Sequence, residues 1–378
     1  MDFAISEEQV AIADLAACLF SDHCTDEQLL AYDNTTDAYD QVLWKKVVDA
    51  GLQALLLPEV VGGSGLGMLE FGMVMEAQGR ALAPVPLWRH QLAVATLLRF
   101  GADARARSLA SAAASGEPLA TLSLDGLAQA RGIELRASCE GGRWRLDGVV
   151  PAVAQAAQAA WALLTATVDG QLHLVLVELS AAGIKLVPAT YTQGEAVADI
   201  VCAQAIVPVT AILPAAALVW LEPRAIACVA ALQLGVTEQQ LKRTAEYINE
   251  RKQFDRVIAS FQAVQMQMAD GLIAREVLRT SLWQLCYRLD QNLGAQSQAL
   301  ATKYLASEVG HRVGHMAQHL HGGMGVDLTY PMHRYLYWSR ALGLALGGSA
   351  ATLARLGDWL ADNDTLGWKY DLDEPPAL

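Results

Sequence analysis

An arginine, two aromatic residues and an amide gather in one short stretch of the chain. Arg251 is followed by Phe254, and Gln262 comes directly after a second aromatic residue, Phe261. A guanidinium can bond two phosphate oxygens at once, an aromatic ring offers a stacking face, and an amide can bond the edge of a base. The stretch therefore predicts a site for a phosphate and a nucleobase. The alternative is an exposed arginine beside a phenylalanine of the core.

A glycine-rich stretch further along the chain could bind the same kind of ligand. His319 is followed by Gly322, Gly323 and Gly325. Paired glycines let a ligand approach the backbone closely and leave N–H groups available for an anion. His319 can itself bond a phosphate or an adenosine.

Three histidines of this region are spaced four residues apart, namely His311, His315 and His319. On a helix they would share one face, and two histidines so spaced can bind a metal ion. No glutamate completes an H-E-x-x-H pattern, so we predict no metal site. His311 and His315 are then structural or interface residues.

Two long helices must position these residues. Apolar residues recur at helical spacing on both sides of residues 251–261, which predicts helices that meet at that turn. These residues are Leu234, Leu241, Tyr247 and Ile248 before the turn, and Ile258, Val264, Met268, Leu272 and Leu278 after it. The alanine-rich stretch 214–234 predicts a buried helix, although Glu222, Pro223 and Arg224 interrupt it.

The rest of the chain predicts an α+β fold with a β-domain between two helical domains. Residues 1–117 predict helices, the first of them capped by Ser6. Residues 118–214 predict short antiparallel strands, because runs rich in Val, Leu and Thr alternate with Gly and Asp. Those runs are 133–135, 144–146, 161–165, 172–177 and 200–207. Residues 215–362 return to helix, and 363–378 are predicted to be an acidic tail.

Charge and cysteine content exclude several classes of protein. The formal net charge of −13 argues against nucleic acid or an anionic membrane as the main partner, since both would require a basic surface. The six cysteines show no C-x-x-C spacing, so neither a zinc site nor a disulfide framework is indicated. No secretory signal and no unbroken apolar run of bilayer length is found, so we expect a cytoplasmic protein.

These motifs, taken together, resemble the acyl-CoA dehydrogenase family. The family shows the same order of an R-x-Q-F segment, an F-Q pair, a G-G-x-G segment after a helix, and a Tyr-Pro pair, here Tyr330–Pro331. The N-terminal part is also similar. Its matching segments are Met1–Gln9, Leu43–Lys45, Gly51–Leu52, Pro58–Glu59, Gly62–Gly67 and Glu76–Pro86.

The resemblance implies a fold, a reaction and a cofactor. The fold has an N-terminal helical domain, a small middle β-barrel or sandwich, and a C-terminal four-helix bundle. The reaction is the α,β-desaturation of an acyl-CoA thioester, with FAD as hydride acceptor and an electron-transfer flavoprotein as partner. In the family, one subunit's middle domain holds the isoalloxazine, and the neighbour's C-terminal domain holds the ADP half. The residues that match the ADP-binding set are Arg251, Phe254, Gln262, His319, Gly322 and Gly323.

The chain departs from the family at the catalytic base. The family's glutamate precedes a Gly-Thr-Ser segment, and the matching position here is Leu346, before Gly347. Some members place the base instead on the helix that leads to the R-x-Q-F turn, where this chain has Ala225. Neither side chain can accept a proton. Glu222 lies about one turn earlier and is the nearest substitute, or else an acid at the N-terminus of a helix before Pro223.

The flavin-ring contacts of the middle domain are missing as well. The family's loop of the Thr-Glu-Pro-x-Ala-Gly-Ser-Asp type corresponds here to residues 123–131, and its Trp-Ile-Thr-Asn type segment corresponds to residues 151–155. Neither stretch keeps the motif. The base and the ring contacts are lost together, while the ADP-binding set remains.

Three hypotheses follow. In the first, the chain is the glutamate-lacking subunit of an α2β2 acyl-CoA dehydrogenase, similar to those of bacterial steroid side-chain breakdown. A homologous partner then supplies the glutamate and shares the FAD. In the second, the chain forms a homotetrameric dehydrogenase with Glu222 as base. In the third, it is a flavin-free scaffold or an acyl-CoA-binding protein.

Overall fold

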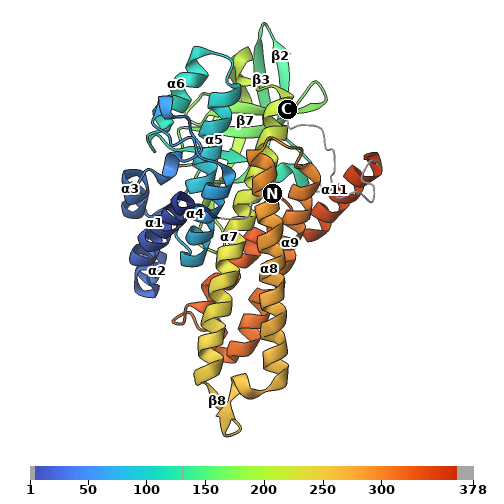
Figure 1. The fold of residues 1–378 in the computed structure, drawn as a ribbon. Coiled ribbons are helices and arrows are strands. Elements are labelled where there is room, and N and C mark those ends of the chain that lie inside the picture. The colour runs from blue at the N-terminus through green and yellow to red at the C-terminus, as the bar shows by residue number, and fades with distance from the viewer. Residues whose placement is uncertain (1–4, 129–131, 364–378) are drawn as a thin grey trace. The chain divides into compact units, whose positions relative to one another are not determined.

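The computed structural model describes residues 5–128 and 132–363 (Figure 1). Two compact units emerge from its contacts. The first unit combines the described residues up to Ala31 with Gly72–Ala83 and the described residues from Ile226 to Asn363. The second unit combines Tyr32–Phe71 with Pro84–Ala225. The division into domains at residues 117 and 214 therefore stays a prediction, although helices give way to strands and strands to helices near those positions.

Helices make up the N-terminal part. They are α1 (Glu7–His23), α2 (Asp26–Asp33), α3 (Gln41–Asp49), α4 (Met68–Ala81), α5 (Leu87–Phe100) and α6 (Ala104–Ala113), with short 3-10 turns at Leu52–Ala54 and Glu59–Val61. Ser6 caps α1 as predicted: its hydroxyl accepts from the Gln9 N–H, and the Gln9 side chain accepts from the Ser6 N–H. This reciprocal pair satisfies two backbone donors that the helix leaves free.

Seven strands form the middle sheet. They are β1 (Ala120–Ser123), β2 (Arg136–Glu140), β3 (Arg143–Ala154), β4 (Trp161–Val168), β5 (Gln171–Glu178), β6 (Ile184–Thr190) and β7 (Ala196–Val207). β1 and β6 were not predicted, and the run 133–135 lies before β2. The purely antiparallel prediction is wrong, because β1 and β2 both pair with β4 in parallel. All but one residue of β4 are buried, as expected for a strand between two others.

The C-terminal part is helical again. It contains α7 (Ala215–Glu250), α8 (Gln262–Asp290), α9 (Gln296–His321), α10 (Met332–Leu344) and α11 (Ser349–Asp362). α8, α10 and α11 all pack against α9. The hairpin of β8 (Lys252–Gln253) and β9 (Arg256–Val257) joins α7 to α8 at one end of the bundle, as Figure 1 shows. The predicted turn between two long helices is thus confirmed. The predicted acidic tail from residue 364 lies outside the described residues.

α7 is long and apolar enough, by length and composition, to cross a membrane. Its most apolar 18-residue window has a mean hydropathy of 1.6, and 72% of that window is buried inside the protein. A buried core helix meets the same criterion, and burial agrees with the prediction for residues 214–234.

Two glycines bring α4 and α7 into close approach. A Cβ atom at Gly235 would lie 1.9 Å from the carbonyl oxygen of Glu76, and one at Gly79 would lie 2.1 Å from that of Leu232. No side chain fits at either position. Beside this crossing, Glu76 and Glu238 each pair with the guanidinium groups of Arg80 and Arg279, at 2.9–3.2 Å.

Candidate functional site

The β8–β9 hairpin has a two-residue turn and carries the predicted aromatic residue, Phe254, at its tip. Lys252 pairs with Val257 and Gln253 with Arg256, which leaves Phe254 and Asp255 as the turn. Both turn residues have positive φ angles, 53° and 63°, as a tight turn matching the strand twist requires. The Phe254 side chain is therefore 86% exposed. The alternative of a core phenylalanine is wrong.

Arg251 begins this hairpin and is exposed. Its carbonyl accepts from the Ile258 N–H at 2.9 Å, which closes the base of the hairpin. Within residues 5–128 and 132–363, its guanidinium forms no hydrogen bond or ion pair. Arg256 differs, because its guanidinium lies 3.9 Å from the centre of the Phe261 ring. Arg251 is thus a cation available to an anionic ligand, whereas Arg256 stacks on its own chain.

Gln262 and His319 are also exposed. Gln262 is the first residue of α8, and His319 lies in the last turn of α9. In the described part of the chain, neither side chain has a hydrogen-bond partner. Both could therefore bond a ligand without giving up an internal contact.

The glycines after α9 leave open space above the backbone. Gly322 has a φ of 58°, and a Cβ atom at Gly322 or Gly323 would meet no atom within 4 Å. At Gly325, by contrast, a Cβ would lie 2.4 Å from the Gln318 side-chain oxygen. Gly325 thus packs closely against the Gln318 side chain, while Gly322 and Gly323 present a backbone that a ligand can approach.

A ring contact that the sequence did not reveal joins these two motifs. His321, the last residue of α9, stacks on Tyr247 of α7 with ring centres 4.3 Å apart and planes inclined by 22°. Tyr247 lies one turn before Arg251, whose N–H donates to the Tyr247 carbonyl at 2.9 Å. The structure thus brings the hairpin and the Gly322–Gly323 segment to the same end of the bundle. The signal available in the sequence was a histidine directly before a paired glycine.

The two other histidines of α9 lie on its exposed face. Arg340 of α10 approaches His311 Nδ1 at 3.5 Å and His315 Nε2 at 3.3 Å. Partial desolvation and the neighbouring His311 and Arg340 lower the pKa of His315. The described residues contain no group of three or more His, Cys, Asp or Glu side chains that could hold a metal ion.

Both positions where the family carries its base are buried and apolar. Leu346 follows α10 with 6% of its surface exposed and a φ of 58°. Ala225 is fully buried in α7. In the described chain, neither position offers a group that can take a proton.

Glu222 is buried too, with 8% exposed. Its interpretation as an acid at a helix N-terminus is wrong, because α7 begins at Ala215 and runs on through Pro223. A proline inside a helix removes one hydrogen bond, here to the carbonyl of Val219. Val219 is 50% exposed.

The segment 151–155 of the middle sheet uses its polar groups internally. The Ala152 N–H donates to the Asp199 carboxylate at 2.8 Å, and the Ala152 carbonyl accepts from the Tyr191 hydroxyl at 3.3 Å. The Gln155 amide donates to Glu195 at 3.3 Å. Burial and nearby carboxylates raise the pKa of Tyr191 to about 12, so its hydroxyl stays a donor at neutral pH. Little of this segment remains available to bond a flavin ring.

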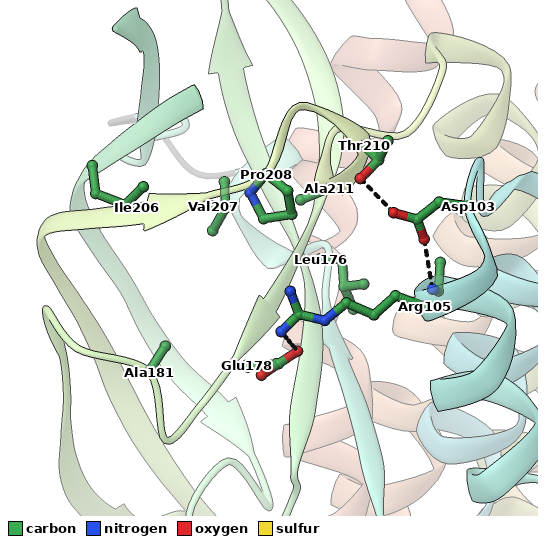
Figure 2. A pocket seen from close by; sticks show the side chains of 11 residues that line it. Asp103, Arg105, Leu176, Glu178, Ala181, Ile206, Val207, Pro208, Thr210 and Ala211 are labelled. Carbon is green, nitrogen blue, oxygen red and sulfur yellow. Dashed lines mark hydrogen bonds and ion pairs between the residues drawn. The ribbon is translucent and has the colours of Figure 1, made fainter. Parts of the chain in front are cut away.

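A surface pocket of the second unit is lined by Asp103, Arg105, Glu178 and Thr210, among others (Figure 2). Asp103 caps α6 by accepting from the Ala106 N–H at 2.7 Å, and it also accepts from the Thr210 hydroxyl at 2.6 Å. Arg105 pairs with Glu178 across the pocket. Because Asp103 is bonded to Thr210 and Arg105 is paired with Glu178, the pocket offers a ligand little beyond its apolar wall.

Comparison with known proteins agrees with the motifs. The family "Acyl-CoA dehydrogenase, N-terminal domain" matches residues 6–117, and "Acyl-CoA dehydrogenase, C-terminal domain" matches residues 224–361. Acyl-CoA dehydrogenase FadE27 of Mycobacterium tuberculosis is 34% identical over 96% of this chain and 99% of its own.

Two solved structures are also similar. The ChsE4–ChsE5 complex of Mycobacterium tuberculosis has 34% identity and a TM-score of 0.90 over 96% of this chain and 99% of the other. A variant of the Tcur3481–Tcur3483 steroid ACAD has 36% identity and a TM-score of 0.89 over 95% and 99%. The α+β fold predicted from the motifs is thereby confirmed, and the family implies a flavin cofactor. The chain belongs to the acyl-CoA dehydrogenase family.

Proposed function

We propose that this chain is the glutamate-lacking subunit of a heteromeric acyl-CoA dehydrogenase. A homologous chain supplies the catalytic glutamate and the groups around the flavin ring. This chain supplies the groups that hold the ADP half of the shared FAD. The substrate is an acyl-CoA thioester, and the electrons pass on to an electron-transfer flavoprotein in the cytoplasm.

The observation that carries the proposal is the absence of a base at either expected position of the described chain. Removing the α-proton of a thioester requires a carboxylate facing the substrate. Leu346 and Ala225 place buried hydrocarbon there instead. In the proposed assembly, this chain takes part in the reaction beside another chain that provides the base.

The residues at the hairpin end of the bundle fit the ADP half of FAD. Arg251 can bond two pyrophosphate oxygens, and the backbone at Gly322 and Gly323 is open to a phosphate. The exposed Phe254 ring offers a stacking face, while Gln262 and His319 can bond adenosine or phosphate. FAD, when bound, supplies the hydride acceptor of the reaction. The segment 151–155 does not fit the isoalloxazine, because Asp199, Tyr191 and Glu195 occupy its polar groups.

An exposed apolar stripe on α8 supports association with a second chain. Met266 and Ile273 are each 62% exposed, and Leu272 and Val277 are each 47% exposed. Met266, Ile273 and Val277 are spaced seven and four residues apart, so they share one face of the helix. Apolar side chains gathered in this way are typical of a protein interface.

The similar structures support both the assembly and the substrate class. The ChsE4–ChsE5 structure is described as a complex, and the Tcur3481–Tcur3483 protein as a steroid ACAD. By analogy we propose an α2β2 assembly acting on the CoA thioester of a steroid side chain. A homotetramer with Glu222 as base is the second candidate, which the place of that carboxylate in α7, about one turn before Ala225, favours.

Flavin content tests the proposal. Because the ring contacts are missing here, the chain expressed alone should purify without the absorbance of bound flavin. Co-expression with the homologous chain that carries the glutamate should give a yellow complex with one FAD per pair of chains. Stoichiometric flavin in the isolated chain would refute the shared site and favour the homotetramer.

A further inference from the structure

The last residue of α9, His321, forms a cluster of three aromatic rings with Tyr247 and Tyr330. His321 is 3% exposed, with the Tyr247 ring 4.3 Å away on one side and the Tyr330 ring at 5.5 Å. Tyr247 and Tyr330 are themselves 6.4 Å apart. The three rings come from α7, from the end of α9 and from the segment before α10.

The hydrogen bonds of His321 fix one neutral tautomer. Its Nδ1 lies 2.8 Å from the Ala317 carbonyl, which can only accept, so Nδ1 carries the proton. Nε2 is then an acceptor, and it is buried with no partner in the described chain. A proton on Nε2 would find no acceptor there, and burial lowers the pKa of His321 accordingly. The ring therefore stays uncharged and stacks flat on Tyr247.

This stack connects the two motifs of the nucleotide site. Gly322 follows His321 directly, and Arg251 lies one helical turn after Tyr247. The Tyr247 hydroxyl also reaches the His321 carbonyl at 3.4 Å, the last carbonyl of α9. A movement of α9 relative to α7 would have to break the ring stack before the separation between Arg251 and the glycine amides could change.

We infer that His321 is a positioning residue, which acts through Tyr247 to hold the Gly322–Gly323 backbone and Arg251 at the separation that one pyrophosphate requires. This inference rests on the proposed function. Groups that are already in place when a ligand arrives bind it more tightly, since less ordering is needed on binding. His321 itself need not touch the nucleotide.

The test combines three variants of the co-expressed complex. His321→Ala removes the stack, and His321→Phe keeps a flat ring but loses the bond to Ala317. His315→Ala is the matched control, because His315 is an exposed histidine of the same helix. We expect FAD to bind about tenfold more weakly to His321→Ala, with most of the loss recovered in His321→Phe and none in His315→Ala.

A double variant separates positioning from general stability. If His321 acts through Arg251, then His321→Ala should change FAD affinity little once Arg251→Ala is present, because contacting networks are not additive. Full additivity, or unchanged affinity in His321→Ala when Arg251→Ala alone weakens binding, would overturn the inference.

Trypsin cleavage of the isolated chain provides a readout that needs no FAD. The hairpin contains Arg251, Lys252 and Arg256 as cleavage sites. Loss of the ring stack between His321 and Tyr247 should raise the cleavage rate at these sites severalfold in His321→Ala. The rate should stay unchanged in His315→Ala, which keeps the stack. If Arg251→Ala does not affect FAD binding, the proposed function fails. In that case the cleavage rate of His321→Ala is the only remaining test. An increase supports the role of the His321–Tyr247 stack in holding α9 against α7, and no increase refutes it.

Discussion

Replacing Arg251 by alanine tests the nucleotide site most directly. The guanidinium is exposed and has no hydrogen bond or ion pair within the described residues, so its removal should change the free energy of unfolding by less than about 0.5 kcal/mol. Binding should respond far more strongly. Truncating one partner of a charged, hydrogen-bonded pair costs on the order of 2 to 4 kcal/mol, because the phosphate charge is left unpaired. FAD should therefore bind about 30- to 900-fold more weakly.

The assay is a fluorescence titration of FAD against the apo form of the co-expressed complex. Arg256→Ala is the matched control, since it removes the same charge from the same hairpin while its guanidinium stacks on Phe261. The control should bind FAD with near-normal affinity. Normal affinity in Arg251→Ala would show that this arginine is merely a surface charge. Equal losses in both variants would indicate general electrostatic attraction rather than a specific phosphate contact.

Three further predictions concern the base, the interface and one buried histidine. Glu222→Gln should leave the turnover rate of the complex within a few-fold of that of the unsubstituted complex. Loss of a true general base would lower the rate roughly 100- to 10,000-fold. A loss of that size with FAD binding and assembly intact would assign the base to this chain. Ile273→Glu should abolish co-purification of the partner chain, whereas Val60→Glu, at a position 91% exposed, should not; co-purification of both would exclude α8 as the interface. Burial lowers the pKa of His90 from 6.5 to about 4, so stability is complete above pH 6.5 and falls by up to about 3 kcal/mol as pH drops toward 4. His90→Gln should lose that pH dependence in urea unfolding, and an unchanged profile would contradict it.

Local rules predicted the helices well. Ser6 marked the start of α1, and the apolar spacing around residues 251–261 predicted the turn between α7 and α8, because caps and helix faces depend on neighbours in the sequence. The sheet was predicted less well. Parallel pairing of β1 with β4 joins Ala120 to Trp161, a distant pairing that no local pattern specifies.

The residues of the candidate site stay a prediction from the sequence, and their geometry could not be predicted from it. The resemblance indicated Arg251 and Gly322, but it did not indicate that Phe254 stands at a hairpin tip with a left-handed backbone. It also missed His321, because an interaction between α7 and the end of α9 involves residues 74 positions apart. The continuation of α7 through Pro223 was missed for a similar reason, since tertiary packing can outweigh the usual effect of proline.

The crossing of Gly79 and Gly235 limits how this chain can diverge from its relatives. At either glycine, any side chain would collide with the carbonyl of the facing helix, so a substitution would require both backbones to separate. The ion pair between Arg80 of α4 and Glu238 of α7 spans the same two helices and would be stretched by that separation. Neither Gly79 nor Gly235 can therefore be replaced, and no single substitution elsewhere would relieve the collision. A chain that keeps this helix crossing must therefore keep both glycines.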